Sequence, residues 1–87
     1  MPNHDEIIAR IQSITKERLD LPPDLGNVDS ETLLFKGGLE LDSFNVVELI
    51  SELEAQFAFE FLESDFREEH FRTVGTLGGL VDRYLNG

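Results

Sequence analysis

The side chain best placed to carry chemistry in this chain is the hydroxyl of Ser43, although its surroundings are not those of a catalyst. A nucleophilic serine needs a histidine base, and the elbow motif of hydrolases has a glycine on either side of the serine. Leu41 and Phe44 lie around Ser43 instead, and no base is near it in the sequence. Gly37-Gly38 is followed by Leu39 and lacks the lysine of a phosphate-binding loop.

Other reactive or metal-binding side chains are scarce. The chain has no cysteine, so it has no thiolate nucleophile, thiolate ligand or disulfide of its own. His4 and His70 are not paired at a metal-site spacing. With 18 acidic residues in 87, pairs such as Glu68-Glu69 occur by chance and are read as a solvated face. We therefore expect neither an enzyme nor a metal site.

The position of Ser43 along the chain is more informative than its neighbours. It follows a long apolar connection and begins the clearest helical pattern, over residues 42–57. Asp42 is a good N-cap, which leaves Ser43 in the first turn with its hydroxyl free. The free N–H groups and the dipole at this end of a helix favour a phosphate-bearing group. The alternative is that Ser43 belongs only to the capping cluster.

Helical periodicity indicates what must position this serine. A first helix is predicted over residues 3–19, with Asn3 as its cap and Glu6 at the capping-box position, and Pro22-Pro23 ends it. Residues 20–41 form a long connection, with one helical turn expected at residues 31–35. This connection should lie against the core because it carries seven large apolar side chains, namely Leu25, Val28, Leu33, Leu34, Phe35, Leu39 and Leu41.

The second predicted helix, over residues 42–57, has two faces. The apolar face consists of Val46, Val47, Leu49, Ile50, Leu53 and Phe57. The opposite face consists of Asn45, Glu48, Ser51, Glu52 and Gln56.

The rest of the chain predicts an extended linker at residues 58–61, a short helix over residues 64–70 capped by Ser64, and a last helix capped by Thr73. Gly78 and Gly79 inside that last helix either permit a close helix crossing or weaken the helix. The expected fold is all-α, a small four-helix bundle of three longer helices and one short helix with a long first loop. We expect a single domain over residues 1–87.

Charge narrows the class of partner. The chain carries 7 basic and 18 acidic residues, a net charge of −11, and residues 42–70 hold nine acids and one base, Arg67, a net charge of −8. Such a surface repels nucleic acids and anionic lipids and favours a basic protein partner. There is no signal-peptide pattern and no apolar run of membrane-spanning length. We expect a soluble, cytoplasmic monomer.

Residues 38–50, with the sequence GLELDSFNVVELI, resemble the attachment motif of acyl carrier proteins. In that family an Asp-Ser-Leu triplet opens the second helix, and the serine carries 4′-phosphopantetheine. The resemblance covers nearly the whole chain, from the first helix and long loop to the short third helix and the fourth. It implies an acyl-carrier-like fold and a carrier that performs no chemistry itself.

Carried over residue by residue, the resemblance implies that Ser43 bears 4′-phosphopantetheine from coenzyme A, with Asp42 as its acidic neighbour. The prosthetic group would bring the thiol that the chain lacks and hold the cargo as a thioester. The resemblance implies that partner enzymes meet Phe44, Asn45, Val47, Glu48 and Glu54. The expected partners are a phosphopantetheinyl transferase, a loading ligase or transferase, and downstream biosynthetic enzymes.

Departures from fatty-acid carriers bear on the cargo. Asn45 and Ala55 replace acids, and Phe35 with Ser64-Asp65-Phe66 resembles D-alanyl and other aminoacyl carriers. Rings at Phe57, Phe59, Phe61, Phe66 and Phe71 would fill the space that a long acyl chain needs. We expect a small or polar cargo outside the bundle, unless several of these rings face solvent.

A function of another class stays open. A small acidic helical bundle could bind a basic partner without any prosthetic group, as an unmodified protein-interaction module.

Overall fold

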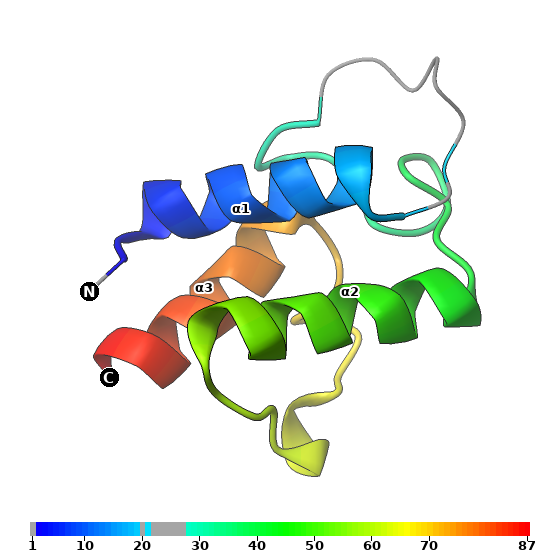
Figure 1. The fold of residues 1–87 in the computed structure, drawn as a ribbon. Helices are drawn as coiled ribbons and strands as arrows, with labels where there is room; N and C mark the ends of the chain where they lie inside the picture. The colour runs from blue at the N-terminus through cyan, green and yellow to red at the C-terminus, as the bar shows by residue number, and fades with distance from the viewer. Residues whose placement is uncertain (1, 20, 22–27) are drawn as a thin grey trace.

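In the computed structural model of this chain, the residues that the structure describes form three α-helices around one apolar core (Figure 1). The structure describes residues 2–19, 21 and 28–87. The first helix, α1 (His4–Glu17), packs against α3 (Val74–Asn86) and less extensively against α2 (Ser43–Phe57). No strand is found in the described ranges, so the predicted all-α class is confirmed.

Side-chain caps fix where the helices begin. The Asn3 side chain accepts the Glu6 N–H at 2.9 Å, so α1 starts at the predicted place. It ends at Glu17, two residues before the predicted end, although Leu19 beyond it is still buried in the core. The Pro22-Pro23 pair that was expected to end this helix lies outside the described residues. Thr73 caps α3 as predicted and forms a capping box with Thr76.

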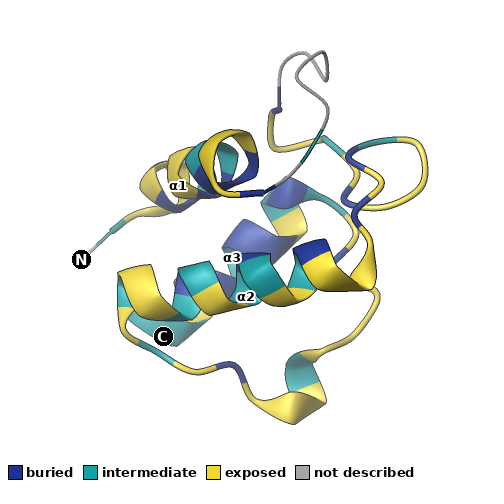
Figure 2. Ribbon diagram, turned by 45° about the vertical axis from the view of Figure 1, so that its right-hand side comes forward, coloured by how far each residue is buried: buried dark blue, intermediate teal, exposed yellow. Residues whose placement is uncertain are grey.

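The core is formed by apolar stripes on the three helices, as the buried faces in Figure 2 show. Apolar residues three and four positions apart lie on the same face of a helix, so each stripe turns inward as a unit. The most deeply buried side chains on the helices are Ile7, Ile11, Ile14, Leu49, Leu53, Val74, Leu77 and Val81. On α2, however, Val47 was assigned to the apolar face and is 63% exposed.

The long connection lies against the core as predicted, but it contains no helical turn at residues 31–35. Leu33 instead forms an isolated antiparallel bridge with Thr73, and the Leu34 N–H donates to the Arg72 carbonyl at 3.0 Å. These extended backbone bonds replace the local bonds that a helical turn would need. Val28, Leu34, Leu39 and Leu41 are buried, whereas Leu33 and Phe35 are exposed; Leu25 lies outside the described residues.

The segment between α2 and α3 corrects one further prediction. The linker predicted to be extended over residues 58–61 has no regular structure at residues 59–61, and Ala58 ends α2 in the left-handed conformation (φ 57°). The helix predicted over residues 64–70 is only a single 3-10 turn, η1 (Glu63–Asp65), and Ser64 does not cap it. Short backbone turns follow, including those closed by the bonds from His70 to Arg67 and from Phe71 to Glu68, and Phe71 is buried in the core. The described part of the chain therefore forms three α-helices and one 3-10 turn.

The glycines of α3 differ in what surrounds them. A Cβ atom at Gly78 would lie 2.6 Å from the Ile8 side chain of α1, so Gly78 permits the close crossing of α1 and α3. A Cβ at Gly79 would meet nothing within 4 Å. A Cβ at Gly75 would lie 2.8 Å from the Ser30 carbonyl oxygen, which also accepts the Gly75 N–H.

We predict opposite effects for two alanine substitutions in this helix. Gly79→Ala should raise the free energy of unfolding by up to about 1 kcal/mol, because alanine favours helix and the added methyl group is unobstructed. Gly75→Ala gains the same propensity but clashes with backbone, so it should lower stability. Thermal unfolding followed by circular dichroism measures both, and a lower melting temperature for Gly79→Ala would contradict the packing described.

Candidate functional site

Ser43 is the first residue of α2, and a capping box holds that end of the helix. Asp42 lies just before the helix with φ −93° and ψ 178°, and its Oδ1 accepts the Asn45 N–H at 2.7 Å. The Asn45 Oδ1 accepts the Asp42 N–H in return, at 3.3 Å. Ser43 itself is exposed, and its hydroxyl makes no hydrogen bond with any described residue. The cap is thus built by its two neighbours, and the serine is left free.

The segment that leads to Ser43, residues 38–41, is held against the core. Leu39 and Leu41 are buried, and their N–H groups donate to the carbonyls of Leu33 and Leu34 at 2.8 and 3.0 Å. Gly38 makes this turn possible, because a Cβ there would lie 2.0 Å from the Leu33 carbonyl oxygen. With both leucines fixed in the core, the chain presents Asp42 and Ser43 at the surface.

The residues that the resemblance assigned to partner recognition divide into two groups. Phe44 and Val47 are 73% and 63% exposed, and Glu48 is half-buried on the same helix. Asn45 was placed on the solvent-facing side of α2, but it is only 8% exposed because its side chain closes the capping box. The Glu54 Oε2 accepts the Phe61 N–H at 2.9 Å, so this carboxylate holds the linker after α2.

An apolar groove, which the sequence did not predict, runs beside α2. It has a volume of about 550 Å³. Val46, Val47 and Ile50 line it from α2, and Phe35, Phe66 and Phe71 line it from the two neighbouring segments. Phe35 and Phe66 are 40% and 47% exposed. Neither Phe35 nor Phe66 belongs to an apolar helical pattern in the sequence, and this was the available sign that the two rings would stay outside the core.

Phe61 and Phe71 are buried, and Phe57 and Phe59 are partly buried against the core. The Phe61 ring is buried and lies 4.8 Å from the Phe59 ring and 5.5 Å from the Tyr84 ring, centroid to centroid. The Tyr84 hydroxyl donates to Asp65 Oδ2 at 2.5 Å and accepts the Leu62 N–H at 2.8 Å. Burial, reinforced by the hydrogen bond to the Asp65 carboxylate, raises the pKa of Tyr84 above its ordinary value.

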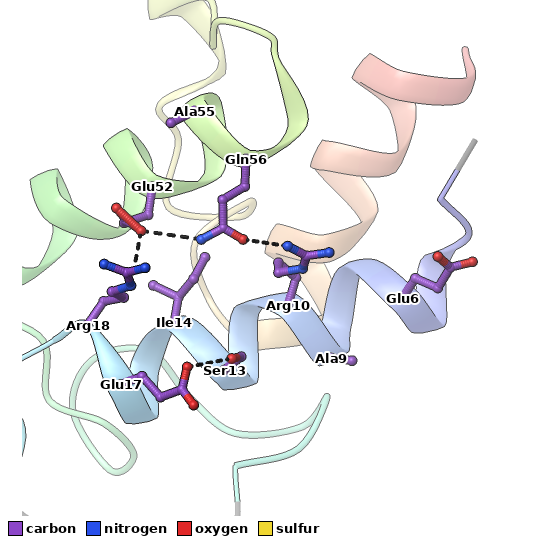
Figure 3. A pocket seen from close by; sticks show the side chains of 10 residues that line it. All are labelled: Glu6, Ala9, Arg10, Ser13, Ile14, Glu17, Arg18, Glu52, Ala55 and Gln56. Atoms are coloured by element: carbon purple, nitrogen blue, oxygen red, sulfur yellow. Dashed lines mark hydrogen bonds and ion pairs between the residues drawn. The ribbon is translucent and has the colours of Figure 1, made fainter.

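A second hollow, of about 670 Å³, lies between α1 and the C-terminal half of α2 (Figure 3). Polar side chains bridge it: Arg10 donates to Gln56 at 2.9 Å, and Arg18 pairs with Glu52 at 3.7 Å. Gln56 in turn donates to Glu52 at 3.3 Å. These bridges tie the two helices together, and exposed pairs of this kind add little stability.

No group of three or more histidine, cysteine or acidic side chains in the described ranges could hold a metal ion. Within the same ranges, no helix is both long and apolar enough to cross a membrane.

Comparison with known proteins gives consistent matches. The family described as phosphopantetheine attachment site matches residues 9–81. The acyl carrier protein of Chlamydia trachomatis serovar L2 is 36% identical over 76 residues, which cover 87% of this chain and 92% of that protein. The acyl carrier protein of Borrelia garinii is 32% identical over 81 residues, or 93% of this chain and 95% of that protein.

A third relative is the acyl carrier protein of Rubrobacter xylanophilus, 40% identical over 63 residues, which cover 72% of this chain and 74% of that protein. No solved structure matches the chain significantly.

The contact between Glu54 and Phe61 leads to a stability prediction. Glu54→Ala leaves the Phe61 N–H without its charged acceptor, and it should lower the free energy of unfolding by about 1–2 kcal/mol. Glu48→Ala serves as the matched control, since a half-buried acid with no described partner should change stability by at most about 0.5 kcal/mol. Urea unfolding measures both variants, and equal stabilities would contradict the structural role of Glu54.

Proposed function

The chain belongs to the acyl carrier protein family, whose members hold 4′-phosphopantetheine and serve biosynthetic enzymes as carriers rather than catalysts, and we propose that Ser43 is its attachment site. The observation that carries this proposal is the exposed, unbonded hydroxyl of Ser43 at the capped start of α2. When bound, the group supplies a thiol on a flexible arm, and the cargo is held there as a thioester.

The residues at this helix end fit a phosphodiester. The N–H groups of Asn45 and Val46 are bonded to the side chain and the carbonyl of Asp42, whereas those of Ser43 and Phe44 have no acceptor among the described residues. Two free N–H donors and the positive end of the helix dipole stabilise a phosphate oxygen. Asp42 thus serves the site indirectly, because its carboxylate holds the helix end in shape.

Attachment uses coenzyme A and a phosphopantetheinyl transferase. The Ser43 oxygen bonds to the phosphorus atom that bears the pantetheine arm, and the pyrophosphate bond of coenzyme A breaks to release adenosine 3′,5′-bisphosphate. The hydroxyl proton passes to a base of the transferase. The chain supplies only the nucleophilic oxygen and a surface that the transferase can reach.

Partner enzymes, in this proposal, meet the exposed side of α2 at Phe44, Val47 and Glu48. Two exposed apolar side chains beside an acid suit a partner surface that combines an apolar pocket with basic residues. The net charge of −8 over residues 42–70 would steer such a partner and permit rapid release. Asn45 and Glu54 are left out of this surface because their side chains are engaged in the cap and the linker.

We propose an acyl or aminoacyl cargo that stays outside the helical core. The core is occupied by apolar side chains, including the buried rings of Phe61 and Phe71, which supports the exclusion of a long chain from the interior. The groove beside α2 offers apolar contact at the surface. Its lining favours an apolar acyl group over a polar amino acid, which revises the expectation of a polar cargo.

The remaining parts of the proposal concern the whole chain. We propose that residues 1–87 act as one carrier domain, supported by the packing of all three helices on one core. We also propose that the chain works as a monomer in the cytoplasm, a compartment in which reduced thiols and coenzyme A are available.

The attachment site can be tested by mass. Incubation with a phosphopantetheinyl transferase and coenzyme A should add one phosphopantetheine to the chain, and Ser43→Ala should fold normally and gain none. Ser51→Ala, which changes another exposed serine of α2, is the control and should be labelled like the unmodified sequence. Labelling of Ser43→Ala would show that the site is elsewhere. If neither the unmodified sequence nor either variant is labelled, the result would favour an unmodified interaction module.

The partner surface can be tested by charge reversal. Glu48→Lys should slow phosphopantetheine transfer by roughly three- to tenfold at low salt, because a charge at the edge of an interface acts mainly on the association rate. Glu31→Lys makes the same charge change at an exposed position away from α2 and should have little effect. Equal slowing by both variants would mean that only net charge matters and would contradict the proposed surface.

A further inference from the structure

One wall of the apolar groove has no helix to support it. Residues 66–71 contribute Phe66 and Phe71 to the groove, opposite Val46 and Ile50 of α2. The backbone hydrogen bonds inside this wall are local turns, such as those from His70 to Arg67 and from Phe71 to Glu68. Among the described hydrogen bonds and ion pairs, none joins residues 66–70 to α2. The position of the wall is therefore set by the packing of the Phe66 ring on the rings of Phe61 and Phe71, at 5.8 and 6.0 Å between centroids, and by the hydrogen bonds at its two ends.

The far end of the wall is fixed by the core. Phe71 is 7% exposed, and the carbonyl of Arg72 accepts the Leu34 N–H at 3.0 Å. The Thr76 hydroxyl also donates to the His70 carbonyl at 3.1 Å. These contacts leave little freedom at residues 70–72.

The near end of the wall is fixed by one side chain of α3. The Tyr84 hydroxyl donates to Asp65 Oδ2 at 2.5 Å and accepts the Leu62 N–H at 2.8 Å. It therefore binds the last residue of η1 and the residue that precedes η1. The Tyr84 ring packs on the rings of Phe59 and Phe61, at 5.1 and 5.5 Å between centroids. Asp65 immediately precedes Phe66, the most exposed ring of the groove wall.

We infer that Tyr84 and Asp65 are positioning residues that fix the distance between residues 66–71 and α2, and thereby determine the size of apolar group that the groove accepts. The inference rests on the proposed function, because the groove receives cargo only if a thioester is carried nearby. It also makes a claim about the unloaded chain, since the wall should move when the Tyr84 hydroxyl is removed.

The unloaded chain provides the first test, which does not depend on any modification. In Tyr84→Phe, amide resonances of residues 66–70 and of the groove face of α2 should shift, whereas those of α1 should not. Asp65→Asn keeps an acceptor for the hydroxyl and should shift them less than Asp65→Ala. Asn3→Ala, which removes the cap of α1, controls for a general loss of stability. Unchanged groove resonances in both Tyr84→Phe and Asp65→Ala would overturn the inference.

The single tyrosine gives a second readout. The chain contains one tyrosine and no tryptophan, so an absorbance titration reports on Tyr84 alone. The Asp65 carboxylate opposes ionisation of the hydroxyl, while Arg83 favours it. Asp65→Asn should therefore lower the pKa of Tyr84 toward its ordinary value. An unchanged pKa would mean that the two side chains do not meet in solution.

The loaded chain tests the consequence for cargo. Butanoyl and decanoyl thioesters are loaded from the acyl-coenzyme A compounds by the transferase, and intact mass confirms loading before any rate is measured. The ratio of their cleavage rates by hydroxylamine should change in Tyr84→Phe, by about fourfold for each methylene group that gains or loses contact with the groove. The Asn3→Ala control should keep the ratio of the unmodified sequence. Failure to load would refute the proposed function; successful loading with an unchanged ratio would refute only the positioning role.

Discussion

The short backbone pairing between the long connection and the start of α3 holds the start of α2 at its place in the fold. Leu34 donates to the Arg72 carbonyl, and Val74 and Gly75 donate to the carbonyls of Thr32 and Ser30, at 2.8–3.0 Å. The same stretch then accepts the N–H groups of Leu39 and Leu41, which lead directly to Asp42. A connection without regular structure is thereby fixed at several backbone atoms, as its burial requires. Ser43, which follows this connection, is therefore held at a fixed position on the surface.

The sequence predicted the helices well because their evidence is local. The caps at Asn3, Asp42 and Thr73 and the spacing of the apolar stripes depend only on neighbours a few residues away. The errors arose where distant contacts decide the outcome. The turn expected at residues 31–35 gave way to pairing with Thr73, and the helix expected over residues 64–70 gave way to turns that bury Phe71.

The candidate site shows the same division. The exposed start of α2 could be predicted from the cap and from family resemblance, whereas the roles of Asn45 and Glu54 could not. Asn45 has the polarity of a surface residue, and only the reciprocal bonds with Asp42 explain its burial. Glu54 binds a backbone N–H seven residues later, a contact that no periodicity predicts. The groove likewise requires three segments that are distant in the chain.

The two ends of the described chain lie together at one end of the bundle, and α2 begins at the other (Figure 1). The Asn86 side chain donates to the Pro2 carbonyl at 2.8 Å, which brings the ends into contact. A sensor surface, affinity handle or fluorescent protein joined to either end would therefore lie at the end of the bundle opposite Ser43, and it would not obstruct an enzyme that binds there. The geometry suits immobilised binding assays, in which the face around Ser43 points into the flowing solution.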